Sequence, residues 1–184
     1  FGIGAQTGID LQDESSPALR QDSAWSEVDL ATAAFGQGIA VTPIQMLRAA
    51  AVIANGGKLV DPSIAKADLP GDRRIISETA AAQMTAMMVK AVADGEAKWA
   101  KPAGYTVAGK TGTAQIPVAG HYDAQRTIAS FVGFAPVTHP KFVMLVTLKE
   151  PQSSPWGSET AAPLWFDVAK ELFRYFQIAP DKQV

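Results

Sequence analysis

A change in hydrophobic period after Pro102 constrains the fold more than any other feature of this sequence. Before it, apolar residues recur at helical spacing, and after it come three segments rich in β-branched and aromatic residues. These segments cover 105–116, 127–134 and 141–148, and their links are short enough for an antiparallel meander. Apolar residues spaced at four then predict a final helix over 163–177, with Pro163 at its first position. Helices, then a three-stranded antiparallel sheet, then a helix indicate the α+β class.

Serine and threonine caps mark the helices that precede Pro102. Three N-terminal capping signals predict helices over 27–35, 43–54 and 78–94. The first is a capping box, the second a threonine followed by proline, and the third a single serine. Their capping residues are Ser26, Thr42 and Ser77. Leu30 and Phe35 fall on the expected apolar face of the first helix. The segment 60–74 is the most linker-like part of the chain.

Several large apolar side chains are expected to lie in the core. Met84, Met87 and Met88 are read as ordinary packing of the third helix. Trp156 and Trp165 flank the last helix and are expected to pack in the core or between lobes rather than to bind a ligand.

Composition excludes several classes of function. The chain has 184 residues, which suits one domain or one lobe of a larger domain, and a formal net charge of −2 without a run of like charge. Nucleic-acid binding is therefore not expected, and no apolar stretch is long enough to span a membrane, so we expect a soluble chain. Cysteine is absent, and His121 and His139 stand 18 residues apart, so we expect no metal and no cofactor.

Residues 104–111 match the phosphate-binding pattern G-x-x-x-x-G-K-[ST] letter for letter. A phosphate-binding loop also needs a buried strand before it and a helix that begins at the lysine. Here the preceding segment, 96–102, is polar and ends in proline, and Gly112 and Pro117 oppose a helix after the match. The context therefore disfavours a nucleotide-binding reading.

As a strand, the same segment offers different chemistry. Period two places Thr111 and Thr113 on one face, beside the cation of Lys110. Gly112 allows another chain to approach the backbone closely, so an extended peptide could pair with this strand while Lys110 and the threonines hold a carboxylate. A backbone N–H of the strand could also stabilise an oxyanion, as acyl transfer to a peptide requires.

Seven segments in order along the chain resemble the class B penicillin-binding proteins, with K-T-G-T as the most informative. They are 1–4, 7–14, 36–46, 54–57, Gly95, 110–115 and 131–136. The resemblance implies a partial penicillin-binding transpeptidase or serine β-lactamase-like fold. It also implies a serine that attacks the penultimate D-alanine carbonyl of a peptidoglycan stem peptide, after which an amine on a neighbouring stem resolves the acyl-enzyme. β-Lactams imitate that D-Ala-D-Ala end.

Residue roles carry over on the matching positions. Lys110 would assist the proton relay and bind the substrate carboxylate, and Thr111 and Thr113 would hold the carboxylate and backbone. The Thr113 N–H would form half of the oxyanion hole, and Gly112 would keep the strand open. The resemblance thus gives Lys110 and Thr113 as catalytic residues and Lys110, Thr111, Gly112 and Thr113 as substrate-binding residues.

The family's S-x-x-K and S-x-N motifs lie upstream of the point where this chain begins. The chain starts at Phe1 without an initiator methionine, so we interpret 1–184 as the C-terminal portion of a transpeptidase domain whose nucleophile-bearing part is absent. Ser63 and Lys66 do match S-x-x-K, but Pro62 just before them indicates an extended stretch rather than the head of a buried helix. Ser63 is expected to be an exposed loop serine.

We expect the intact parent to be a serine-type D,D-transpeptidase and this chain alone to be inactive. The parent would be anchored in the cytoplasmic membrane with this domain outside, beside a membrane-embedded glycan polymerase. A non-catalytic or β-lactam-sensing relative is the alternative. The apolar strand at 141–148 would be left as an open edge, so the isolated chain is expected to self-associate.

Overall fold

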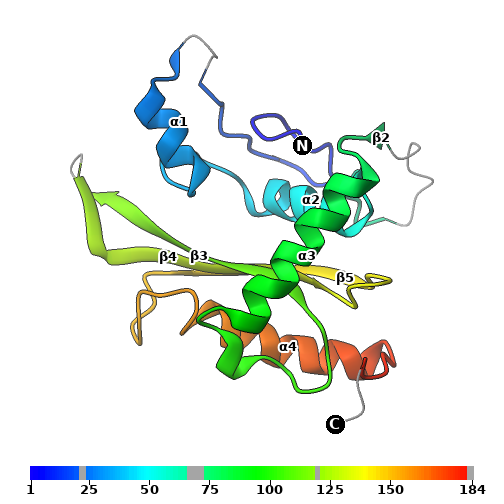
Figure 1. The fold of residues 1–184 in the computed structure, drawn as a ribbon. Coiled ribbons are helices and arrows are strands. Elements are labelled where there is room, and N and C mark those ends of the chain that lie inside the picture. Colours follow the sequence, from blue (N-terminus) through cyan, green and yellow to red (C-terminus); the bar gives the residue numbers. More distant parts are fainter. Residues whose placement is uncertain (21–23, 66–72, 119–120, 182–184) are drawn as a thin grey trace.

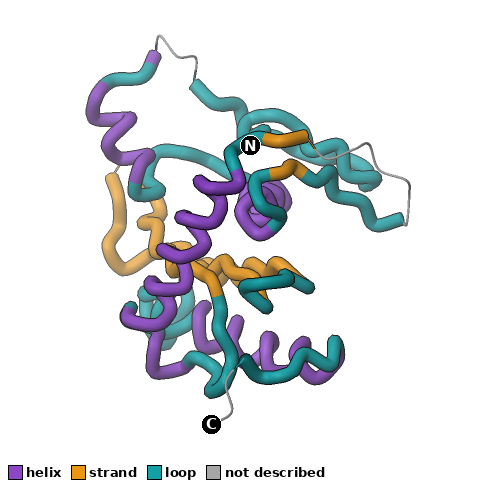
Figure 2. Tube along the Cα trace, turned by 45° about the vertical axis from the view of Figure 1, so that its right-hand side comes forward, coloured by secondary structure: helices purple, strands orange, loops and turns teal. Residues whose placement is uncertain are grey.

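The computed structural model describes residues 1–20, 24–65, 73–118 and 121–181, arranged in layers around a sheet (Figure 1). In chain order the elements are α1 (Glu27–Ala34), α2 (Pro43–Ala54), β1 (Lys58–Leu59), β2 (Arg73–Arg74), α3 (Glu78–Asp94), the short 3-10 helix η2 (Lys98–Ala100), β3 (Ala108–Val118), β4 (His121–Ala135), β5 (Phe142–Lys149) and α4 (Ala161–Tyr175). The sheet of β3, β4 and β5 lies between α4 on one face and α2 with the N-terminal segments on the other (Figures 1 and 2).

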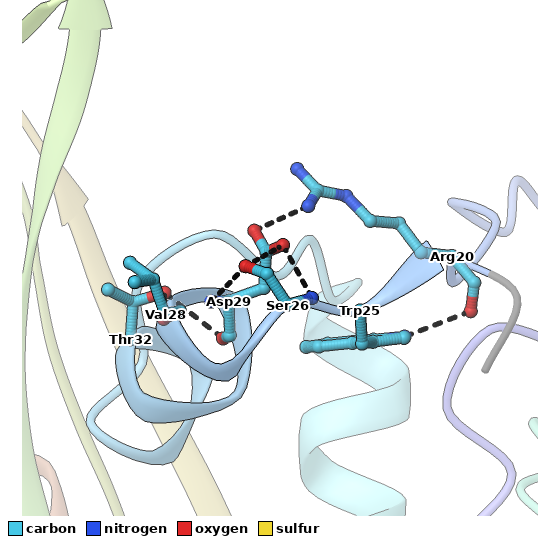
Figure 3. Close-up of polar contacts among 6 residues, drawn as sticks. All are labelled: Arg20, Trp25, Ser26, Val28, Asp29 and Thr32. Atoms are coloured by element: carbon cyan, nitrogen blue, oxygen red, sulfur yellow. Dashed lines mark hydrogen bonds and ion pairs between the residues drawn. The ribbon is translucent and has the colours of Figure 1, made fainter. Parts of the chain in front are cut away.

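The three N-terminal helices begin where their caps predict. The Ser26 side chain accepts from the Asp29 N–H, and the Asp29 carboxylate accepts from the Ser26 N–H (Figure 3). Thr42 and Gln45 form the same reciprocal pair at the start of α2, and Ser77 accepts from the third residue of α3. Each cap satisfies backbone donors that the first helical turn leaves without partners, which confirms the predicted starts.

The last helix begins two residues earlier than its sequence indicates. The Ala162 N–H donates to Gly157 O at 2.9 Å, and α4 starts at Ala161 rather than Pro163. Pro163 therefore occupies the third position, where its missing N–H is still one of the unpaired donors of the first turn. The prediction that Pro163 opens the helix is wrong by two residues.

The main sheet is antiparallel throughout, in the order β3-β4-β5. Thr113 pairs with Ala129, and Phe131 pairs with Val146 on the other side of β4. A second, two-stranded sheet joins β1 and β2 across the segment that we expected to be a linker. The α+β class is confirmed, whereas the prediction of one three-stranded sheet is incomplete because it omits this small pair.

The main core lies between the sheet and α4. Trp165 is fully buried against Phe131, and its indole N–H donates to Met144 O at 2.9 Å. Because truncation of a buried aromatic residue typically costs about 3–5 kcal/mol, this helix face contributes much of the stability. The expectation for Trp165 is confirmed. Trp156 is not a core residue, since it lies in the connection before α4 and is 55% exposed.

The helix surfaces above the sheet are less well covered than their sequence predicts. Met88 is buried with Phe134 in a smaller core, but Met84 and Met87 are 40% and 58% exposed. They line an apolar hollow of about 570 Å³ together with Lys110. The prediction that all three methionines are packed is therefore wrong for two of them.

α1 buries none of its residues. Leu30 and Phe35, expected on its packed face, are 67% and 72% exposed. Polar contacts hold its start instead: Arg20 forms an ion pair with Asp29, and the Trp25 indole donates to Arg20 O (Figure 3). Because an eight-residue helix is marginal in water by itself, α1 depends on these contacts.

Candidate active-site strand

The lysine and threonine of the K-T-G-T segment lie inside β3, near its start. Neither is at the beginning of a helix, because the strand continues to Val118. A phosphate-binding loop requires a helix N-terminus at that point. The nucleotide-binding reading of 104–111 is therefore wrong, and the segment has the extended backbone that peptide pairing requires.

Successive side chains of this strand face opposite layers, as expected for a strand. Lys110 faces the α2 and α3 side, where it lines the apolar hollow. Its ammonium donates to Thr111 O at 2.9 Å and to Thr111 Oγ1 at 3.2 Å. Thr113 lies on the α4 side, where its Oγ1 accepts from the Gly157 N–H at 3.0 Å. Lys110 thus leaves the strand on the face opposite to the two threonines, but its ammonium bends back to the Thr111 hydroxyl.

The Thr113 N–H points away from β4. Gly112 pairs with Ser130. A Cβ atom on Gly157 would lie 2.4 Å from Gly112 O and 3.3 Å from Ser130 N, so Gly112 O is on the β4 side. A trans peptide directs its C=O and N–H to opposite sides. The Thr113 N–H is therefore directed to the other edge of β3, where no strand pairs in the described ranges.

Gly112 has a packing role besides leaving the strand open. A Cβ atom at this position would lie 2.5 Å from Ser130 Oγ on the neighbouring strand. Any larger residue would displace that hydroxyl or push β3 away from β4. Rotation of the Ser130 hydroxyl would relieve this contact, so the packing favours a glycine here without requiring one.

Two further hollows flank the strand. One, of about 300 Å³, includes Lys110, Thr111 and Glu96 among its lining residues. The other, of about 440 Å³, lies beyond Thr113 and includes three exposed aromatic side chains. These are Phe35, Tyr122 and Trp156. Sequence reasoning missed them as site residues, because they come from the end of α1, from β4 and from the connection before α4, and only the fold brings them beside β3.

Ser63, the serine of the S-x-x-K match within this chain, lies in irregular structure after α2 and not at the beginning of a helix. Its hydroxyl donates to the Asp10 carboxylate at 2.9 Å, and that carboxylate also accepts from the Ile64 and Ala65 N–H groups. Lys66 lies outside the described residues. Ser63 therefore anchors the N-terminal loop to this segment.

The same contacts predict an unusual titration of Asp10. Hydrogen bonds from the Ile64 and Ala65 N–H groups, and then from Ser63, lower its pKa from 3.8 to about 2. Because the folded pKa is the lower one, the stabilisation is complete above pH 4 and is lost as the pH falls through 2. We expect NMR titration of the Asp10 carboxyl carbon to give a midpoint near 2, with the Ser63→Ala variant shifted upward. A midpoint near 3.8 would contradict these contacts.

The remaining ionisable candidates do not form a metal site in the described part of the chain. His121 begins β4 and His139 is exposed in the turn before β5. Within residues 1–20, 24–65, 73–118 and 121–181, no three His, Asp or Glu side chains are grouped so that they could hold a metal ion. No helix within these ranges has the length and apolarity needed to cross a bilayer.

Comparisons with known proteins agree with this geometry. The family described as "Penicillin binding protein transpeptidase domain" matches residues 1–173. Stage V sporulation protein D of Bacillus subtilis is 36% identical over 99% of this chain, and peptidoglycan D,D-transpeptidase FtsI of Escherichia coli is 34% identical over 98%. The chain spans 30% and 31% of the length of these two relatives.

Solved structures show the same fold. The apo transpeptidase domain of penicillin-binding protein 3 from Burkholderia pseudomallei superposes with a TM-score of 0.87 at 30% identity, over 99% of this chain and 57% of that one. Penicillin-binding protein 3 of Mycobacterium tuberculosis, complexed with ampicillin, gives a TM-score of 0.88 at 29% identity, over 99% of this chain and 45% of that one. The chain therefore belongs to the transpeptidase domain family of the class B penicillin-binding proteins.

Proposed function

We propose that residues 1–184 form the C-terminal portion of a transpeptidase domain that cross-links peptidoglycan stem peptides through a serine acyl-enzyme. The nucleophilic serine is supplied by a part of the parent protein upstream of this chain. The observation that carries the proposal is the Thr113 N–H, which is directed to the unpaired edge of β3 in the described residues. An extended peptide that pairs with this edge brings its carbonyl within reach of that donor.

Each residue of the segment has a stated task in this mechanism. The serine oxygen bonds to the penultimate D-alanine carbonyl carbon, and the Thr113 N–H donates to the oxyanion that develops on its oxygen. The terminal D-alanine leaves with the proton that the serine gave up, in a relay that Lys110 assists. Lys110, Thr111 and the hydroxyl of Thr113 hold the terminal carboxylate. Thr113 Oγ1 accepts from the Gly157 N–H, and its own hydrogen remains to be donated.

The same edge accounts for β-lactam binding, since these inhibitors imitate the D-Ala-D-Ala end. Support comes from the similar mycobacterial protein, whose structure was solved in complex with ampicillin. The substrate lies in the cell wall, so the parent acts at the outer face of the cytoplasmic membrane. We further propose that a membrane-embedded glycan polymerase supplies the strands that it cross-links.

A fluorescent penicillin tests where the nucleophile resides. We expect the intact parent to give a labelled band that survives denaturation and the isolated chain to give none, because Ser63 hydrogen-bonds to Asp10 in a loop. A labelled band from the isolated chain that disappears in Ser63→Ala would overturn the proposal. Labelling of the intact parent without cross-linking of stem peptides would indicate a β-lactam-sensing protein instead.

A further inference from the structure

The connection between β5 and α4 packs against the peptide unit that carries the candidate oxyanion donor, the Thr113 N–H. A Cβ atom on Gly157 would lie 2.4 Å from Gly112 O and 2.7 Å from Ser130 O. Gly157 does not have a positive φ, so the glycine is required for space and not for backbone conformation. The Gly157 Cα therefore packs directly against Gly112 O, which belongs to the same peptide unit as the Thr113 N–H.

A second contact joins the same two segments. The Gly157 N–H donates to Thr113 Oγ1 at 3.0 Å, across 44 residues of sequence. Gly157 thus contacts Thr113 at its hydroxyl and at its preceding carbonyl. Together the two contacts fix the orientation of the planar peptide between Gly112 and Thr113.

Gly157 is itself held from three directions. Its carbonyl accepts from the Ala162 N–H at the start of α4, at 2.9 Å. The next residue, Ser158, is buried and donates to Glu96 at 3.2 Å. On the other side, the buried Thr127 hydroxyl donates to Pro155 O at 2.7 Å. The connection is therefore fastened to α4, to the segment after α3 and to β4, so it cannot move aside freely.

We propose that Gly157 is a positioning residue for acyl transfer: it sets the direction of the Thr113 N–H and the rotamer of the Thr113 hydroxyl. This inference rests on the proposed function, in which that N–H stabilises the oxyanion. Donors in an oxyanion hole act because they are already oriented when charge develops. A displacement of about 1 Å at such a group can slow a reaction by about 100-fold.

The test is Gly157→Ala in the intact parent, with noncovalent β-lactam binding and the acylation step measured separately by stopped flow. The added methyl group must push Gly112 O away, so we expect the acylation rate constant to fall about 10-fold or more. Noncovalent affinity should change much less. Affinity for a boronate that forms a tetrahedral adduct with the serine should fall by the same factor as the acylation rate constant, because that adduct also needs the oriented donor.

Gly133→Ala is the matched control. Its methyl group would lie 2.8 Å from Ala108 O, another backbone carbonyl of the same sheet, and 3.1 Å from Trp165. We expect a lower melting temperature but an unchanged acylation rate constant per folded molecule. Equal slowing by Gly133→Ala and Gly157→Ala would overturn the inference, because the effect would then be one of general strain.

Two further variants separate the possible failures. If Gly157→Ala does not fold, Thr127→Val loosens the connection without adding volume, and we expect acylation to slow about fivefold. Normal acylation in that case would overturn the inference. Lys110→Ala reports on the proposed function in the same assay. Slow acylation in Lys110→Ala beside normal acylation in Gly157→Ala would overturn only the positioning role.

Discussion

Replacement of Lys110 by alanine in the intact parent should slow acylation by a β-lactam about 100-fold or more. The ammonium group is the only fixed cation in the K-T-G-T segment. In the proposed mechanism it holds the carboxylate and assists proton transfer. Its hydrogen bonds go to Thr111 of the same strand, and the side chain is exposed. We therefore expect the melting temperature to change little, so that loss of rate is not loss of fold.

Lys90→Ala is the matched control for this experiment. Lys90 is also exposed, and it forms an ion pair with Asp94 on α3. Its removal should leave acylation unchanged, because exposed ion pairs contribute little and the site is on another element. Acylation of Lys110→Ala within a few-fold of wild type, together with a sharp drop in melting temperature, would show that Lys110 is structural.

The isolated chain is expected to self-associate through β5. Among the described residues β5 pairs with β4 alone, which leaves the N–H and C=O groups of its other edge for a second chain. Both faces of the strand are covered, since β5 contacts α2 on one side and α4 on the other. Association should therefore proceed edge to edge, and light scattering over a dilution series should show a mass above that of a monomer.

A charge at the edge should prevent that association. Thr147 is exposed on β5, whereas Val143 packs against the smaller core of Met88 and Phe134. Thr147→Lys is therefore expected to shift the mass toward the monomer, and Thr147→Ser should leave it unchanged. A monomer at every concentration, unaffected by either substitution, would mean that the edge of β5 is already protected.

Local features of this fold are readable from the sequence, because they depend on near neighbours. The caps at Ser26, Thr42 and Ser77 each use a residue three positions away. Alternation identifies the three strands but not their bounds. β3 begins at Ala108 rather than 105, and β4 begins at His121 rather than 127 because the hairpin pairing extends to Val118 and His121. The start of α4 could not be predicted in the same way. It depends on the hydrogen bond from the Ala162 N–H to Gly157 O, which helix propensity does not take into account.

Burial was harder to predict, because it depends on which segments meet. Trp156 and Trp165 are only nine residues apart, yet one is exposed and the other is fully buried. Met87 and Phe35 have apolar spacing but no cover among the described residues. Hydrophobic period identifies a face and says nothing about whether another element packs on it.

Only one part of the candidate site could be predicted from the sequence, for the same reason. Lys110 through Thr113 form one continuous segment, so their chemistry can be recognised as a unit. The contact between Gly157 and Thr113 spans 44 residues and involves a residue type with no side chain. A glycine in a loop carries no pattern that would link it to a strand.

We expect the position of the main core to influence the order of folding. Apart from Val92, all of its buried members come from the second half of the chain, although α2 and the N-terminal segments cover the opposite face of the sheet. The strands that support it follow one another as hairpins, which close short loops and fold faster than distant pairings. The second half can therefore nucleate first, and the N-terminal half docks onto a sheet that already exists. In that order the edge of β3 that we propose to bind substrate is formed before the segments that will surround it.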